Sequence, residues 1–321
     1  MPEQRTGTAE RHAAVRERVL RDWGLELPEF LFRYDAFLDS LDPDLARVLG
    51  DLELSAFGIS DLFGNPDAQP SEAGVDVRAH GRFYRDPPEF LTFMHGGSDG
   101  LHFGLWFADG RTCSGVASYY NNDAGELDMT SSTPLEAVRA RIEHSWRDQH
   151  DYYEGEELAE HTGRLARLRD AVTAVETGDR PQIGAAYLKR HVFVWPPILH
   201  YSATTLDRGG ALADGETVLG RPPQNRTDLA AFAPAVHATL NDAEALAAAV
   251  DEARRRCADG DPAEALALGR DLHWTSGFDE VREGYAHELL AAAYEALDRP
   301  ALAGIADAHH RHRRIKSVQV L

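Results

Sequence analysis

Hydrophobic residues at the start of the chain recur with the spacing of an α-helix. Val15, Val19 and Trp23 lie four positions apart, which places all three on one face of a helix. The glycine that follows Trp23 predicts the end of this helix. A second helix is predicted to begin at Pro28, because proline is tolerated in a first turn, and to end at the LDPD sequence of residues 41–44.

In the middle of the chain the pattern changes to short aromatic and β-branched runs separated by glycine and aspartate. The runs are FLTFMH (90–95), LHFGLWF (101–107) and CSGVASYY (113–120), and GGSDG and ADGRT lie between them. Runs of this kind predict antiparallel strands joined in a meander. The polar residues 64–76 and 121–128 predict a connector before the meander and a turn after it.

The remainder of the chain is predicted to be mostly helical. Residues 132–146 follow a Ser/Thr cap and a proline, and residues 155–178 form a second charged, amphipathic helix. Residues 180–226, which are rich in proline and glycine, are predicted to form strands and loops. Beyond residue 227, helices joined by short loops predict a compact helical layer. The expected helices are 242–257, 262–272, 276–297 and 301–310.

These patterns predict an α+β fold, with helices and an antiparallel sheet first and mostly helices afterwards. The chain of 321 residues is long enough for one large domain or two ordinary ones. We expect an N-terminal α/β domain with the antiparallel meander at residues 1–150. A mainly helical C-terminal domain is expected at residues 151–321.

The charge balance restricts the classes of partner. The chain has 33 Lys and Arg against 53 Asp and Glu, a net charge of −20. Such a surface repels nucleic-acid phosphates and anionic lipid, so we expect no direct nucleic-acid binding and no membrane binding. It favours a cationic partner or a small ligand.

The cysteines and the N-terminus indicate a cytoplasmic protein. Cys113 and Cys257 are the two cysteines, and neither belongs to a CxxC pair, which favours a reducing compartment. The N-terminus has no apolar core of signal-peptide length, and no run approaches the roughly 18 apolar residues of a membrane span. The abundance of Ala, Arg and Asp suggests a bacterial gene of high GC content.

The sequence carries no recognisable catalytic or cofactor motif. It lacks GxGxxG after a strand, GxxxxGK[ST], GxSxG and HExxH, so we predict no enzyme activity of its own and no cofactor. His95 and His102 flank the GGSDG turn, where a hairpin could bring them together. The simpler interpretation is two strand residues beside a turn, and we predict no metal site.

Acidic residues gather between two predicted helices, in the sequence CADGDPAEA. Paired carboxylates such as Asp259, Asp261 and Glu264 can act as a general base or as metal ligands. Asp261 precedes Pro262 and occupies the position of a helix N-cap, which is the simpler interpretation of that residue. Asp259 lies one step outside the cap and is freer to point at a partner.

Arg221 is the candidate cation. It lies in LGRPPQNR, a loop stiffened by proline, and an arginine held in this way suits recognition of a carboxylate or a phosphate. The alternative is an ordinary surface arginine.

Three segments together carry a resemblance to a known family. They are LPEFLFRYDAFLDSLDP (27–43), RFYRDPPEF (82–90) and LALGRDLHWTSGFDEVREGYAHELLAAAYEALDR (266–299). In this order they resemble the histone PARylation factor family, the accessory factors that complete the active site of poly(ADP-ribose) polymerases. RFYRDPPEF itself is interpreted as a structural corner, because two prolines can start a strand without donating to its ladder. We expect its Arg82, Phe83 and Tyr84 to pack against the first helices.

The resemblance implies a non-enzymatic accessory protein that binds an ADP-ribosyltransferase and lends it a carboxylate. The family's glutamate, the base that deprotonates a serine acceptor, falls on Asp259, whose side chain is roughly 1.5 Å shorter. Misplacement on that scale costs on the order of a hundredfold in rate. The family's arginine falls on Arg221, whereas its tyrosine and second acidic residue are replaced by Gly220 and Ala258.

This hypothesis has consequences for partners and for geometry. The partners would be the transferase and a basic acceptor such as a histone-like protein, and family members in eukaryotes are nuclear. Arg221, Asp259 and Asp261 would contact the transferase, and Arg221 should share an exposed rim with Asp259.

A second hypothesis needs no catalytic residue. The strands from Leu91 to Tyr120, with the GGSDG turn, are also similar to SMI1/KNR4-like immunity proteins, which are acidic cytoplasmic proteins that neutralise toxins by binding them. The net charge would then steer a basic toxin to this protein. This alternative predicts that Asp259 is dispensable and that salt weakens binding. No motif supports a third possibility, a stand-alone hydrolase or transferase.

Overall fold

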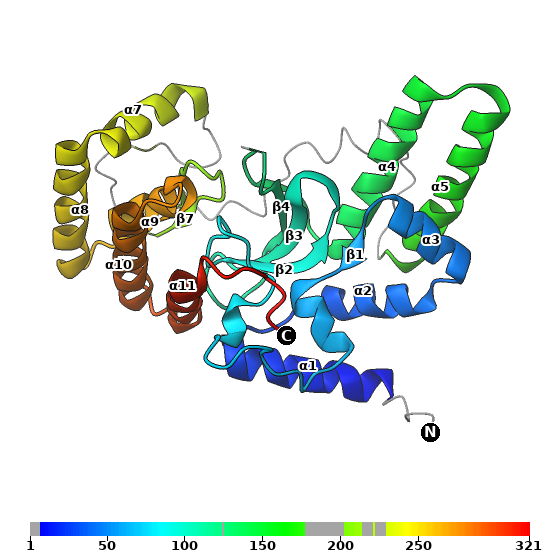
Figure 1. Cartoon of the computed structure of the whole chain (residues 1–321), viewed down its shortest axis with the longest axis horizontal. Coiled ribbons are helices and arrows are strands. Elements are labelled where there is room, and N and C mark those ends of the chain that lie inside the picture. Colours follow the sequence, from blue (N-terminus) through cyan, green and yellow to red (C-terminus); the bar gives the residue numbers. More distant parts are fainter. Residues whose placement is uncertain (1–6, 124, 177–201, 214–220, 222–228) are drawn as a thin grey trace.

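A computed structural model describes residues 7–123, 125–176, 202–213, 221 and 229–321 of the chain. An antiparallel sheet lies in the middle of the molecule, with helices on either side of it (Figure 1). Its strands follow one another in space in the order of the sequence, as a meander requires. They are β1 (Ser55–Ala56), β2 (Phe90–His95), β3 (Leu101–Trp106), β4 (Gly115–Tyr120) and β5 (Asp128–Ser131). The predicted α+β fold and the antiparallel meander are confirmed.

Helices precede and follow the sheet, as predicted. Those of the first half are α1 (Thr8–Trp23), α2 (Glu29–Ser40), α3 (Pro43–Asp51), α4 (Pro134–Tyr152) and α5 (Gly155–Val175). Those of the second half are α7 (Leu229–Asn241), α8 (Ala243–Ala258), α9 (Ala263–Thr275), α10 (Glu280–Ala296) and α11 (Pro300–His312). A small second sheet pairs β6 (Ser202–Ala203) with β7 (Ala211–Leu212). The predicted segment 180–226 lies largely outside the described residues.

Two short elements were not predicted. Helix α3 begins at Pro43, and the Asp42 side chain caps it by accepting bonds from two backbone amides. The LDPD sequence therefore ends one helix and starts the next, where we expected only an end. Strand β5 begins at the last residue of the predicted turn and ends before the predicted helix at residue 132, and it pairs with β4 through an irregular register.

The sheet separates two hydrophobic cores, because successive side chains of a strand point to opposite faces. Phe103 and Leu105 of β3 belong to the first core, together with residues of α1, α2, α4 and α5. Trp106 of β3 and Tyr119 of β4 belong to the second core, with residues of α7 to α11. Every residue of β3 is buried. At Gly104 a Cβ atom would lie 2.4 Å from the ring of Phe90, so only glycine fits there.

The expected boundary between residues 150 and 151 stays a prediction. Helix α4 runs across this position, and α5 packs on α4 and α3. Leu165, Leu168 and Val172 of α5 contribute to the first core. By its packing, α5 therefore lies with the N-terminal elements.

The segment RFYRDPPEF forms a buried corner, and Asp86 is at its centre. The Asp86 carboxylate is fully buried and accepts bonds from the Tyr119 hydroxyl at 2.6 Å and the Phe83 amide at 2.8 Å. One of its oxygens also lies 2.8 Å from Nε2 of His102. The Arg82 guanidinium donates to three backbone carbonyls of the same segment. The interpretation as a structural corner thus agrees with the packing.

The aromatic residues of this corner do not pack as expected. The Phe83 ring centre lies 4.2 Å from that of His102 in the sheet. The Tyr84 hydroxyl lies 3.0 Å from Ser276 and donates to Glu283 at 2.5 Å, so Tyr84 reaches the C-terminal helices. The expectation that these residues pack on the first helices is wrong, because the corner follows the short 3₁₀ helix η2 (Val77–Ala79) and runs between the sheet and α9.

A buried ion network joins this corner to the C-terminal helices. Glu89 lies 2.9 Å from the Arg270 guanidinium and accepts a bond of 2.9 Å from the Tyr294 hydroxyl. Arg270 also pairs with Asp207 at 2.5 Å. The four side chains are buried, so each charge depends on its partners for the solvation that water would supply.

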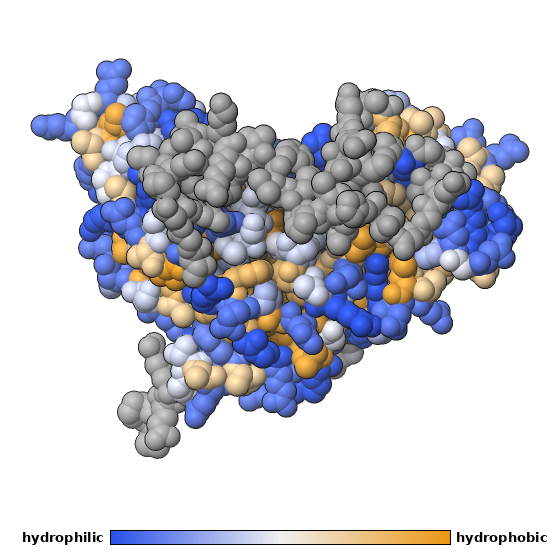
Figure 2. Space-filling model, turned by 180° about the vertical axis from the view of Figure 1, so that it is seen from behind, coloured by the Kyte–Doolittle hydropathy of each residue, from blue (hydrophilic) through white to orange (hydrophobic). Residues whose placement is uncertain are grey.

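The face seen from behind is mostly polar at its edges (Figure 2). Seen from behind, hydrophilic residues cover most of the periphery and hydrophobic residues concentrate toward the middle (Figure 2). Within the part of the chain that the structure describes, none of the helices has the length and apolar character needed to span a bilayer.

Two buried histidines should make the fold sensitive to acid. Burial, together with the charge of Arg313, lowers the pKa of both His273 and His309 well below the usual value. Below about pH 6.5 the unfolded chain therefore takes up protons that the folded protein excludes, and the free energy of unfolding falls. The expected loss is up to about 1.4 kcal/mol per pH unit for each histidine.

Urea denaturation between about pH 7.5 and pH 5.5 measures this slope. His309→Leu should make the slope shallower, because the proton that His309 takes up only in the unfolded chain is then lost. An unchanged slope in His309→Leu would show that this histidine is protonated equally in both states.

Candidate functional site

Asp259 lies in the tight turn between α8 and α9. It occupies the C-cap of α8, and its amide bonds back to Arg255 and Cys257. Gly260 follows with φ of +93°, a conformation that side chains disfavour, and this residue turns the chain toward α9. Two well-packed helices therefore hold the turn from both sides.

The Asp259 carboxylate is accessible to a partner. Its side chain is 65% exposed, and one oxygen lies 2.8 Å from Arg255 on the preceding turn of α8. Arg255 is itself 60% exposed and also pairs with Glu252. Ion pairs this exposed contribute little to stability and exchange readily with water. The expectation that Asp259 projects from the turn agrees with this geometry.

Asp261 is not the N-cap that the sequence suggested. Helix α9 has Pro262 at its N-cap, without a side-chain cap bond. Asp261, one residue earlier, accepts a long bond of 3.4 Å from the Ala263 amide and lies 3.7 Å from Arg256. Its side chain is 34% exposed. Asp261 is thus half-buried next to Asp259.

Arg221 lies in a different environment. Its side chain is fully buried, and its Nη1 lies 2.6 Å from the Asp271 carboxylate of α9. The same nitrogen donates to the Thr204 carbonyl at 3.0 Å. Glu264, the third carboxylate of the sequence cluster, is also buried and lies 3.9 Å from the guanidinium. Arg221 therefore neutralises one face of α9.

The structure does not bring Arg221 and Asp259 together on one exposed rim, so that expectation is wrong. The physical reason is that α9 buries two carboxylates, and burial raises the pKa of Asp271 even beside Arg221. A buried carboxylate requires a nearby cation. Glu264 and Asp271 are seven residues apart in α9, which puts them on one face of the helix. This spacing of two carboxylates on one helix face could have predicted that an arginine lies buried beside them.

The hairpin brings together the two histidines that were considered as metal ligands. His95 and His102 are register partners in β2 and β3, as the turn predicts. Both ring nitrogens of His102, however, are engaged, with Asp86 and with the Gly100 carbonyl at 2.8 Å. Across the described ranges, no group of three or more His, Cys, Asp or Glu side chains is arranged to hold a metal ion.

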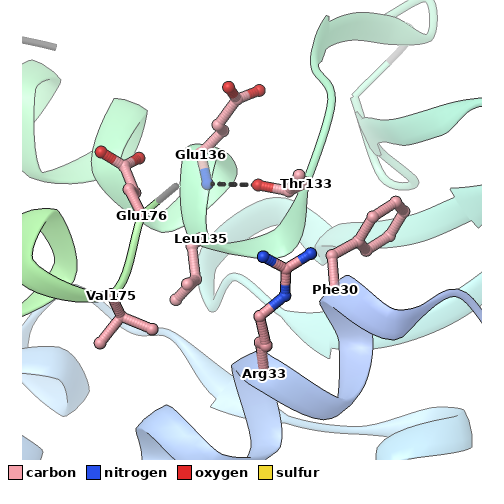
Figure 3. Close-up of a pocket in the computed structure, with 7 residues that line it drawn as sticks. All are labelled: Phe30, Arg33, Thr133, Leu135, Glu136, Val175 and Glu176. Carbon is pink, nitrogen blue, oxygen red and sulfur yellow. Dashed lines mark hydrogen bonds between the residues drawn. The ribbon is translucent and has the colours of Figure 1, made fainter. Parts of the chain in front are cut away.

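A small pocket lies between α2 and the start of α4 (Figure 3). The Arg33 side chain extends from α2 toward Leu135 and the helix end at Thr133. The volume is about 50 Å³, room for little more than one or two water molecules. Glu136 in its wall accepts a bond from the Ser132 amide, so it belongs to the cap of α4. This pocket is therefore too small for a substrate.

Comparison with known proteins identifies relatives. A family model described as histone PARylation factor 1 matches residues 14–177, about half of the chain. Proteins of that name are 31% identical over 100 residues in Mus musculus (30% of this chain, 28% of the relative) and 32% over 101 residues in Danio rerio (30% and 28%). The Bos taurus protein is 33% identical over 89 residues (26% and 25%). The chain thus matches about a quarter of the length of these curated relatives. The matched family segment ends before Asp259.

Arg221 and Arg255 offer a matched test of the two environments. Arg221→Ala leaves Asp271 buried without its cation, and we expect a loss of about 3–5 kcal/mol in the free energy of unfolding. Arg255→Ala removes the exposed partner of Asp259 and should change stability little. Urea denaturation measures both. Equal stability of the two variants would mean that Arg221 does not neutralise α9 in solution.

Proposed function

This chain belongs to the histone PARylation factor 1 family, and from that premise we propose that it is a non-enzymatic accessory protein of a poly(ADP-ribose) polymerase-type ADP-ribosyltransferase. In this proposal it binds the transferase and places the carboxylate of Asp259 in the active site of its partner. The acceptor is a basic protein, in keeping with the net charge of −20.

One observation carries the proposal: Asp259, on which the resemblance places the lent carboxylate, is exposed on a turn between two packed helices. A lent catalytic group must be accessible before binding and held in place after it. The exposure of Asp259 meets the first condition, and its position between α8 and α9 meets the second. In the same turn, Asp261 adds a second negative charge for contact with the transferase.

The chemistry is that of a general base. A carboxylate within about 2.6–3.2 Å of a serine hydroxyl can take its proton as the hydroxyl attacks. Asp259 must first release Arg255, which an exposed ion pair permits at low cost. Its side chain is roughly 1.5 Å shorter than a glutamate, so the backbone of the turn must approach the acceptor more closely than in relatives with glutamate.

Arg221 enters this proposal as a positioning residue. Its bonds to Asp271 and to the Thr204 carbonyl tie α9 to the segment that precedes β7. Because α9 forms one side of the turn, this tie supports the position of Asp259. Direct contact between Arg221 and a partner would require its side chain to leave a fully buried site.

The toxin-binding alternative is an outcome of the test rather than a second proposal. The similarity behind it covers Leu91 to Tyr120, and this segment lies within residues 14–177, which the histone PARylation factor 1 model matches.

Stimulation of a transferase by Asp259 variants tests the proposal. We expect the wild-type protein to accelerate modification of a basic, serine-containing peptide by a polymerase-type transferase of the same organism, with NAD⁺ as donor. Asp259→Asn keeps the shape and removes the base, so the stimulated rate should fall by about 10²–10⁴-fold. Asp259→Glu restores the longer side chain and should stimulate at least as well as the wild type.

Asp261→Asn is the control, since it removes a neighbouring charge and keeps the proposed base. Binding of the transferase, measured by titration, should survive in Asp259→Asn. Full stimulation by Asp259→Asn would refute the proposed role. The toxin-binding alternative would be favoured if the wild type and Asp259→Asn bound a basic toxin equally well, in a salt-sensitive way, and neither stimulated a transferase.

A further inference from the structure

Phe278 adopts a backbone conformation that bulky residues avoid. It follows α9 with φ of +68°, in the left-handed region where a Cβ atom crowds the backbone. Its side chain is among the most exposed of the large hydrophobic residues described, at 66%. A turn that served the fold alone would be better formed by a second glycine after Gly277.

Two side chains from distant segments hold Phe278 in this conformation. Its amide donates to the Tyr84 hydroxyl at 2.6 Å, and its carbonyl accepts a bond of 3.0 Å from Arg314. Tyr84 in turn donates to Glu283 of α10. Both backbone polar groups of the strained residue are thus bonded by side chains. Strain maintained in this way is typical of sites that present a group to a ligand.

The ring of Phe278 is the outer member of a stack. The Arg313 guanidinium lies 4.1 Å from the centre of the Tyr84 ring, and the Phe278 ring centre lies 4.2 Å from it. Two groups this close to one ring centre must approach it from opposite faces. The stack therefore runs Arg313, Tyr84, Phe278 and then solvent. Within the described part of the chain, no cation lies over the Phe278 ring.

The rim of this ring has the charge that a cation requires. Glu280 is 83% exposed, and Asp279 is exposed beside it. Glu283 and Glu280 both pair with Arg314, at 3.0 Å, whereas the Asp279 side chain caps α10 by accepting bonds from two backbone amides. The neighbouring Arg282 of α10 donates a bond to the Leu240 carbonyl at the end of α7. Val281, three residues along the chain, is 62% exposed and adds an apolar side chain to this surface.

We propose that the outer face of Phe278 is a docking site for an arginine or lysine side chain of a basic protein partner. The cation stacks on the ring as Arg313 stacks on Tyr84, its aliphatic stem covers Val281, and Glu280 pairs with its charge. The site does not depend on the role of Asp259. The 13 residues of α9 separate the two by about 20 Å along the helix axis.

Peptide binding tests the site without any transferase. The probe is a short, fluorescently labelled peptide that alternates arginine and alanine, and its control replaces each arginine by citrulline, which is similar in shape but neutral. We expect Phe278→Gly and Phe278→Ala to weaken binding of the arginine peptide roughly three- to tenfold. The citrulline peptide should bind the wild-type protein no better than these variants bind the arginine peptide.

Matched variants separate this site from general attraction to an acidic protein. Tyr152→Ala removes an aromatic side chain that is 81% exposed elsewhere and should leave binding unchanged. Glu280→Gln should weaken binding more than Glu157→Gln, which removes one exposed charge at the start of α5.

Stability measurements show whether the ring serves the fold instead. Phe278→Gly relieves the left-handed strain that Phe278→Ala keeps, so its melting temperature should be the higher of the two and within a few degrees of the wild type. The proposal fails if Phe278→Gly binds the arginine peptide as the wild type does, or if Tyr152→Ala weakens binding equally. It also fails if Phe278→Gly melts far below the wild type while binding is kept.

Discussion

The buried ion pair between Glu89 and Arg270 connects the two halves of this protein. Glu89 ends the corner that leads into the sheet, and Arg270 lies in α9, between the proposed carboxylate site and the Phe278 turn. Burying these charges costs solvation, so the network adds little net stability. The network disfavours other arrangements of the two halves, because any shift of α9 would leave a buried charge without its partner. The positions of both ends of α9 therefore depend on this interaction.

The sequence was most informative where local chemistry decides the structure. Glycine and aspartate turns between aromatic runs predicted the meander, and Gly24 ended α1 as expected. Asp259 could be recognised as free to project, because its neighbour Gly260 and the following proline define a turn. Short elements such as α3 and β5 escaped prediction, since a few residues give too little periodicity to distinguish them from loops.

Tertiary partners explain what local reasoning missed. Arg221 looked like a surface residue because the carboxylates that bury it lie on α9, far along the chain. Tyr84 was assigned to the first helices, but its hydroxyl bonds to Ser276, Glu283 and the Phe278 amide, all in the C-terminal half. Contacts of this kind are set by how the two cores meet at the sheet. No local sequence motif predicts these contacts.

The alternation of β3 between two cores has a consequence for the history of this chain. Phe103 and Leu105 belong to one core and Trp106 belongs to the other, so the two cores share a single strand. Recombination that separated the two cores would expose one face of β3 to solvent. Insertions and replacements should therefore accumulate at the outer helices and loops, and the two halves should be inherited as one unit.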